Sequence, residues 1–244
     1  IFRSRRDAEL TKQFYRTSKY SEPWPFSLGT LFHSSNDADK FQDAETLERD
    51  GWLLDEFGCF RRGVEKAIPL YEGKMFSIYD HRAATVVFSE EALIRQRQSV
   101  QTSLTQHQDP TFSARPFFWV SDERIEPEFR WKWILCFKKV TSSTNERTLI
   151  TSVLPACAAN DSIHLLFPNK EGLGPAFACL LGNLSSYALD YVGRQKLGGV
   201  NFNFFVFQQL PILSAEIFEQ PCPWSNNAST LCAWLLPRVL ELTY

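Results

Sequence analysis

The chain has 244 residues, of which 44% are hydrophobic and 22% are charged, and its formal net charge is −2. This composition is typical of a globular protein, and the length suffices to bury about three quarters of the unfolded surface. The near-neutral charge excludes an overall basic field, so any surface that binds nucleic acid has to be local.

The first element that the sequence predicts is a basic helix. Residues 1–20 hold six basic and two acidic side chains, and the spacing of Leu10 and Phe14 fits an amphipathic helix that begins near Asp7. Two prolines in the stretch EPWPF, residues 22–26, then predict a loop, because proline removes a backbone donor and restricts the residue before it.

A short acidic helix and a series of strands follow. The pattern DAETLERDGW predicts a helix that is capped by Asp43 and ends at Gly51. Short apolar runs between Gly51 and Phe88 alternate with glycine and polar turns, which is typical of strands. The polar stretch EALIRQRQSVQTSLTQHQ fits a helix or a loop, and PFFWV and FRWKWILCFKKV again read as strands.

The C-terminal half predicts more helix. In STNERTLITSVLPA, a Ser/Thr cap precedes Glu146 by three residues, and this capping-box pattern predicts a helix over the apolar residues that follow. The stretch PAFACLLGNLSSYALDYVGRQKLGG has apolar residues at helical spacing from Pro175 to the stop at Gly198 and Gly199. The aromatic run VNFNFFVFQQLPI reads as a short strand closed by Pro211.

Strands and helices occur without a regular strand–helix–strand period, which predicts an α+β fold with a mixed, twisted β-sheet region and packed helices. We expect three parts: a basic helical lead-in over residues 1–35, an α+β domain over residues 36–213, and a C-terminal loop with the start of a truncated helix over residues 214–244. The start at Ile1 and the end inside an apolar periodic run indicate a segment of a longer polypeptide.

The cysteines and the apolar runs bear on compartment. Six cysteines are scattered without a CxxC or CxxxC pair, so the sequence predicts neither a zinc site nor a disulfide framework, and we expect reduced, mostly buried thiols. No signal peptide opens the chain, and no apolar run approaches the roughly 18 to 20 residues of a membrane span. We therefore expect a cytoplasmic protein without a membrane partner.

One stretch, PLYEGKMFSIYDHRAATVVF, concentrates ionisable groups. Asp55 upstream, with Glu72 and Lys74, fits a loose pattern in which two carboxylates hold magnesium and a lysine orients water, as in metal-dependent nucleases. The competing interpretation is a network of ion pairs at a strand edge. His81 beside Arg82 fits a general base next to an anion clamp, or a histidine with a structural role.

Two further clusters resemble surfaces that read nucleic acid. Asn145 and Arg147 combine an amide and a forked cation near a predicted helix start, where phosphates and base edges are bound readily. Arg194 and Lys196 precede two glycines that allow close backbone approach, and Asn201 and Asn203 lie alongside. The competing interpretation is that these groups cap helices and complement their dipoles.

Several catalytic motifs are missing from the sequence. There is no dinucleotide fingerprint, glycine-rich phosphate loop or Gly-x-Ser-x-Gly elbow. The glycine-rich cofactor loop and the Asn/Asp-Pro-Pro-aromatic tetrapeptide of adenine methyltransferases are also missing. The segment itself should therefore neither bind a methyl donor nor transfer a methyl group.

Six stretches in order nevertheless carry a resemblance, and together they cover nearly the whole chain. They are IFRSRRDAELTKQFYR, FSLGTLFHSSNDADKF, IPLYEGKMFSIYDHRAATV, TSSTNERTLITSVLP, LLGNLSSYALDYVGRQKLGGVNFNFFVFQQLPIL and WLLPRVLELTY. This series resembles the C-terminal part of bacterial adenine-specific DNA methyltransferases, in fused restriction-modification enzymes and phage-defence methylases.

The resemblance implies a target-recognition domain that follows the catalytic module of its parent. Such a domain grips double-stranded DNA and reads bases while the methyltransferase module of the same polypeptide flips the target adenine. S-adenosylmethionine is expected in the parent, and no cofactor or metal in this segment. The implied DNA-binding residues in the shared motifs are Lys74, His81, Arg82, Asn145, Arg147, Arg194, Lys196, Asn201 and Asn203.

Motifs shared by enzymes that read different DNA sequences cannot discriminate bases. Base readout should therefore lie in the less typical stretches, residues 89–108 and 111–139, through pairs of arginine with guanine and of glutamine with adenine. The candidates there are Arg95, Gln96, Arg97, Gln98, Arg115, Arg124, Arg130 and Lys132. Two alternatives remain: a magnesium-dependent nuclease domain that uses Asp55, Glu72 and Lys74, and a protein-docking module of a phage-defence complex.

Overall fold

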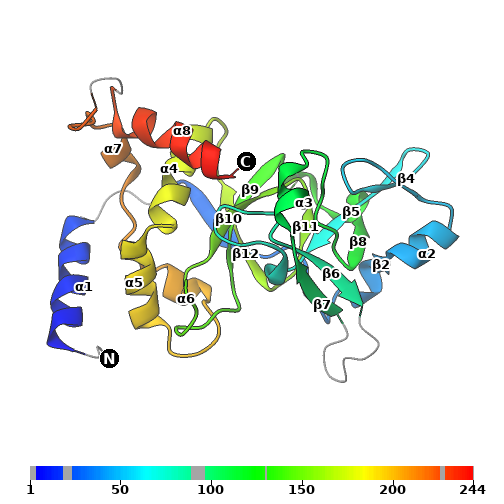
Figure 1. Cartoon of the computed structure of the whole chain (residues 1–244), viewed down its shortest axis with the longest axis horizontal. Coiled ribbons are helices and arrows are strands. Elements are labelled where there is room, and N and C mark those ends of the chain that lie inside the picture. Colours follow the sequence, from blue (N-terminus) through cyan, green and yellow to red (C-terminus); the bar gives the residue numbers. More distant parts are fainter. Residues whose placement is uncertain (1–3, 19–23, 89–96, 130, 226–228, 244) are drawn as a thin grey trace.

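The chain folds into the predicted α+β class, with a four-stranded sheet at its centre. The computed structural model describes residues 4–18, 24–88, 97–129, 131–225 and 229–243. Figure 1 shows helices α1 and α4–α8 gathered at one end of the molecule, the central sheet in the middle, and a second sheet with a two-stranded ribbon at the other end.

The central sheet is antiparallel and has the order β1-β12-β9-β10. Its strands are β1 (Phe26–Gly29), β12 (Ile163–Pro168), β9 (Trp133–Lys138) and β10 (Thr151–Pro155). Strand β9 is apolar along most of its length because both of its faces are covered. Leu135 and Phe137 point into one buried cluster, and Ile134 and Cys136 point into another.

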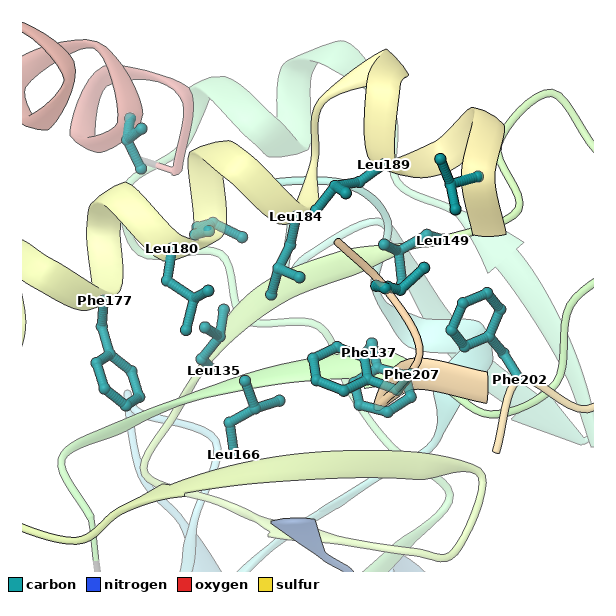
Figure 2. Close-up of a cluster of buried hydrophobic side chains, with 14 of the residues drawn as sticks. Leu135, Phe137, Leu149, Leu166, Phe177, Leu180, Leu184, Leu189, Phe202 and Phe207 are labelled. Atoms are coloured by element: carbon teal, nitrogen blue, oxygen red, sulfur yellow. The ribbon is translucent and has the colours of Figure 1, made fainter. Parts of the chain in front are cut away.

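Helices cover one face of this sheet, as Figure 2 shows. Phe177, Leu180 and Leu184 pack from helix α4 onto Leu135, and Phe207 stacks on Phe137 with ring centroids 4.4 Å apart. The helices are α1 (Arg5–Thr17), α4 (Gly174–Leu184), α5 (Tyr187–Lys196), α6 (Phe204–Phe207), α7 (Ala215–Phe218) and α8 (Leu231–Thr243).

The second sheet packs on the opposite face of the central sheet, through Tyr71, Met75 and Phe76. Its order is β2-β8-β5-β4-β3, and β11 pairs parallel to β5. The strands are β2 (Phe41–Asp43), β3 (Leu53–Leu54), β4 (Phe60–Arg62), β5 (Glu65–Tyr71), β8 (Phe118–Ser121) and β11 (Ala158–Ala159). Helix α2 (Ala44–Arg49) and the 3₁₀ turns η1 (Ala38–Lys40), η2 (Gly73–Met75), η3 (Asp122–Arg124) and η4 (Pro127–Phe129) complete this end.

A separate two-stranded ribbon projects from this end of the molecule (Figure 1). It consists of β6 (Ala84–Phe88) and β7 (Arg97–Gln101), which pair antiparallel, and α3 (Leu104–Gln108) follows it. Val86 anchors the ribbon in the cluster between the sheets, whereas every residue of β7 is exposed.

Several predicted elements are confirmed. Helix α1 begins close to Asp7, whose N–H bonds to the Ser4 hydroxyl. Helix α2 is capped by the Asp43 carboxylate and is followed by Gly51 at a φ of +81°. The strands expected between residues 51 and 88 and in the two aromatic stretches are present.

Four predicted elements are wrong or incomplete. The polar stretch that was expected as a helix or a loop forms strand β7 before helix α3 in its described part. The stretch with the capping-box pattern around Glu146 is a loop that leads into β10, because its β-branched residues enter the sheet and its N–H groups find a distant acceptor. The long helix from Pro175 is two helices, since Ser186 caps the second. The aromatic run expected as a strand is helix α6, which Asn203 caps.

None of the helices in the described part of the chain is both long and apolar enough to cross a membrane.

Strand β1, which lies in the expected lead-in of residues 1–35, is an edge strand of the central sheet, and α8 packs on α4.

Candidate nucleic-acid interface

The β6–β7 ribbon presents one face to a groove. Because partners in an antiparallel pair share a face, Thr85, Val87, Gln98 and Val100 lie together. This face borders a groove of about 600 Å³, and Val100 is 52% exposed. On the opposite face, the Arg97 guanidinium lies 4.9 Å from the centre of the Phe118 ring.

Lys74 fastens the outer strand of this ribbon. Its Nζ atom donates to the carbonyl oxygen of Arg97 at 3.0 Å and lies 3.2 Å from Oε2 of Glu72. The lysine extends from η2, which belongs to the second sheet's connection into the ribbon. The shared motif that contains Lys74 therefore positions the start of β7.

Arg82 fastens the segment that follows the ribbon. Its guanidinium donates to the carbonyl oxygens of His107 at 3.1 Å, Asp109 at 3.1 Å and Phe112 at 3.3 Å. Its own carbonyl oxygen accepts from the Thr102 hydroxyl. A guanidinium that donates to three carbonyl oxygens stabilises the backbone of this segment, and a phosphate would have to compete with these oxygens for the guanidinium.

Asp80 completes this attachment. One carboxylate oxygen accepts from the Arg82 N–H at 2.8 Å, and the other lies 2.9 Å from Nε2 of His107 in α3. Tyr79, just before, has a φ of +61°, which turns the chain sharply at this point. We call Lys74, Asp80 and Arg82, with their partners, the ribbon platform.

A basic cleft of about 630 Å³ adjoins the ribbon groove, and the two share the loop around Thr111 and Phe112. Four cationic side chains and one histidine line it, against one carboxylate, Glu56. We define the basic cleft by these five residues: Arg61, Lys66, His81, Arg82 and Lys132. Such a local excess of positive charge attracts phosphate on a molecule whose net charge is −2.

Two lysines of the basic cleft carry uncompensated charge. The side-chain amines of Lys66 and Lys132 make no ion pair or hydrogen bond with any other residue that the structure describes. Lys66 lies opposite Arg61 in the β4–β5 register, so both side chains occupy one face. Arg61 is paired with Asp55 at 2.7 Å. Lys132 was a base-readout candidate in the sequence, whereas Arg61 and Lys66 were not among the candidates.

A sequence signal for the missed pair does exist. The stretch FRRGVEKA places a glycine turn between two charged strand ends, which is a hairpin pattern that brings Arg61 and Lys66 side by side. What the pattern does not reveal is which of its charges are neutralised by carboxylates elsewhere.

His81 lines the cleft as a neutral side chain. Burial, reinforced by the charge of Arg82, lowers its pKa below the usual histidine value. The imidazole is therefore uncharged at pH 7 and can offer a hydrogen bond but no positive charge. This places His81 in the cleft as a polar wall residue.

Arg147 and Arg194 converge on a buried carboxylate. Asp190, 4% exposed, accepts from the N–H groups of Thr148 at 2.7 Å and Leu149 at 2.8 Å. Arg194 lies 3.1 Å and Arg147 3.6 Å from this carboxylate. The two arginines thus join the loop before β10 to helix α5.

Both guanidinium groups have further partners within the protein. Arg194 also donates to the carbonyl oxygens of Ser143, Asn145 and Glu146, and Arg147 lies 4.5 Å from the centre of the Tyr187 ring. Two motifs of the resemblance therefore meet here as an internal network.

The other residues of the shared motifs take varied positions. Asn145 and Asn201 are exposed, and Asn201 forms an isolated bridge to Val140. Asn203 caps α6 by accepting from the Val206 N–H. Lys196 donates to Oε1 of Gln209 at 3.1 Å.

The remaining readout candidates lie around the ribbon. Arg115 is exposed beside the ribbon groove, and its N–H donates to the Thr85 hydroxyl. Arg124 is exposed in η3. Arg95, Gln96 and Arg130 lie outside the described residues.

The nuclease pattern does not assemble as a metal site within the described residues. Arg61 and the N–H groups of Phe57 and Cys59 occupy the Asp55 carboxylate. Burial acts to raise the pKa of Asp55, but these donors hold it below its usual value. Across the described ranges, no three His, Cys, Asp or Glu side chains group closely enough to hold a metal ion.

Compared with models of known protein families and with curated proteins, the chain matches none.

Proposed function

We propose that this chain is the DNA sequence-recognition domain of an adenine-specific DNA methyltransferase or fused restriction-modification enzyme. It positions double-stranded DNA for base flipping and methylation by a preceding catalytic module, which would hold S-adenosylmethionine. The observation that carries this proposal is the β6–β7 ribbon, mounted on its platform beside a cleft that contains the uncompensated Lys66 and Lys132.

The ribbon supports a reading role by its shape and its chemistry. A two-stranded ribbon fits the major groove of B-form DNA, where each base pair presents a distinct pattern of donors, acceptors and methyl groups. One ribbon face carries Gln98 for an adenine edge and Val87 and Val100 for thymine methyl groups. The platform residues come from the shared motif, and the ribbon strand they hold comes from a less typical stretch. This agrees with the expectation that shared motifs position the domain while the less typical stretches read bases.

The basic cleft supports a positioning role. Lysines bind phosphate as point charges and contribute affinity without base discrimination. Lys66 and Lys132 can bind the backbone beside a groove-bound ribbon, because their cleft and the ribbon groove share one loop.

Binding of double-stranded DNA to the purified chain, measured by fluorescence anisotropy across a salt series, tests this proposal. The variant Lys66→Ala/Lys132→Ala should bind more weakly and should lower the slope of log K against log salt by about 1.8, since each lost phosphate contact contributes about 0.9. Lys12→Ala/Lys170→Ala, which removes the same charge away from the cleft, should leave the slope unchanged. Equal effects of the two variants would contradict the proposal.

A further inference from the structure

Helices α4 and α8 bring two cysteines together outside the proposed interface. Cys179 lies buried on α4, and Cys232 lies half-buried near the start of α8. The Cys232 sulfur is 3.9 Å from the carbonyl oxygen of Pro175, one helical turn before Cys179. The Cys232 side chain lies close enough to Cys179 to perturb the ionisation of its thiol.

The two helices pack closely along the faces that carry these thiols. Gly182 is three residues beyond Cys179 and so shares its face of α4, and Val239 is two turns beyond Cys232 on α8. A Cβ atom added to Gly182 would lie 3.2 Å from Cγ2 of Val239. The glycine thus permits a close approach on the same helix faces that carry the two thiols.

We propose that Cys179 and Cys232 form an intramolecular disulfide when the protein meets a low-molecular-weight disulfide. The bond would tie α8 to α4. Helix α8 supplies Leu236, Val239 and Leu240 to the lining of an apolar cavity of about 590 Å³, and this lining also includes His81 and Lys132 of the basic cleft. Oxidation would therefore fix one wall of a cavity that adjoins the proposed interface.

The reaction is a two-step thiol–disulfide exchange. Burial and the neighbouring thiol raise the pKa of Cys179 to about 12, so the more accessible Cys232 reacts first as its thiolate. It attacks one sulfur of the small disulfide, which forms a mixed disulfide and releases one small thiolate. Cys179 then loses its proton to solvent, attacks the Cys232 sulfur and expels the second small thiolate, and both released thiolates take up protons. Two protein thiols are oxidised, and one small disulfide is reduced to two thiols.

Three of the other four described cysteines differ in ways that predict selectivity. Cys136 is fully buried, and burial raises the pKa values of Cys136 and Cys157 well above the usual thiol range. Cys59 is buried as well, and burial likewise raises its pKa. These thiols supply little thiolate at pH 7 to 8, so they should stay reduced under the same treatment.

The purified 244-residue chain, incubated with oxidised glutathione and then alkylated and digested with trypsin, tests this proposal. Because Cys222 and Cys232 fall on the same tryptic peptide, residues 197–238, a Cys222→Ser variant assigns the bond. We expect peptide 171–194 linked to peptide 197–238, with the loss of two hydrogens, and the same link from wild type located by fragmentation. The linked form should unfold at a higher temperature than the reduced form, and dithiothreitol should reverse this shift.

A Cys232→Ser variant should leave Cys179 alkylatable after the same treatment, whereas Cys157→Ser should form the link as wild type does. Six alkylatable thiols after oxidation would overturn the proposal. So would a glutathione adduct that persists on Cys232 without resolving.

Discussion

Asp190 joins helix α5 to the loop before β10 through its buried carboxylate. Its carboxylate organises two backbone N–H groups and two arginines from segments about 40 residues apart. A buried carboxylate of this kind is stable only with its partners, and the partners are stable only with it. Residues that look like ligands for phosphate in the sequence thus serve as internal fasteners in the fold.

Replacing Asp190 with alanine should therefore destabilise the protein strongly. We expect a loss of roughly 3–5 kcal/mol in the free energy of unfolding, because two guanidinium groups and two N–H groups lose their acceptor. Urea unfolding followed by circular dichroism measures this loss. Asp39→Ala, at an exposed site, should change stability by no more than about 0.5 kcal/mol. A comparable change in both variants would contradict the role given to Asp190.

His164 gives the protein a pH-dependent stability. Its ring is 5% exposed, neither ring nitrogen has a hydrogen-bond partner among the described residues, and it packs against Phe204 and Phe137. Burial and the charge of Lys139 lower its pKa to about 4, despite the opposing charge of Asp161.

Between pH 6.5 and pH 4 the unfolded chain therefore binds a proton at His164 that the folded chain does not bind. Stability from this residue is complete above the unfolded pKa and falls as the pH drops, by roughly 2 kcal/mol between pH 7 and pH 5. Urea unfolding at both pH values should show a loss that is smaller by this amount in His164→Leu than in wild type. Parallel losses would show that another group is responsible.

At the scale of elements, local patterns predicted those parts of the fold whose partners lie nearby in the sequence. The strands between residues 51 and 88 and helix α2 could be predicted, because alternation and caps act over a few residues. The stretch around Glu146 could not, since the acceptor for Thr148 and Leu149 lies on α5. The strand predicted for the aromatic run before Pro211 was wrong for a different reason. The Asn203 side chain caps helix α6, and this cap outweighs the strand propensity of the aromatic residues.

The candidate site was predictable to a similar extent. The sequence named Lys132, His81 and Arg82 as separate candidates and did not show that they line one cleft. Lys132, which precedes β9, and the motif of residues 79–82 are distant in the chain. The carbonyl partners of Arg82 and Arg194 also could not be predicted. An arginine that donates to backbone carbonyl oxygens and an arginine that binds phosphate look the same in the sequence.

The ribbon platform makes a prediction at this scale. Arg82→Ala removes three hydrogen bonds to the segment after β7, so the amides of β7 and α3 should exchange with deuterium roughly ten- to a hundredfold faster. Amides of the central sheet should keep their protection. Hydrogen exchange measured by mass spectrometry distinguishes these regions, with Arg124→Ala as the control. Uniform loss of protection would mean that Arg82 supports the whole fold and not the ribbon.

At the scale of the whole molecule, the less typical stretches, residues 89–108 and 111–139, contain parts that the buried core constrains and parts that it does not. Strands β8 and β9 belong to the two sheets, and their buried residues fill the core, so they cannot vary freely. The outer strand of the ribbon is exposed throughout and contributes no described residue to the buried core clusters. A change of DNA specificity that spares folding should therefore concentrate in the ribbon.

On the proposed function, exchange of residues 89–101 for those of a methyltransferase with another target tests this division in the proposed parent polypeptide. The exchanged protein should methylate adenines in a different sequence, because the proposed base-edge contacts would move with the ribbon while the proposed phosphate contacts at Lys66 and Lys132 would remain. Sequencing of methylated sites in cells that carry each version measures the outcome. In the same assay Gln98→Ala should relax recognition at one position, and Lys66→Ala/Lys132→Ala should reduce methylation without changing the sequence recognised. If the exchange leaves the methylated sequence as it was, base readout lies elsewhere, with the exposed Arg115 and Arg124 as the next residues to replace.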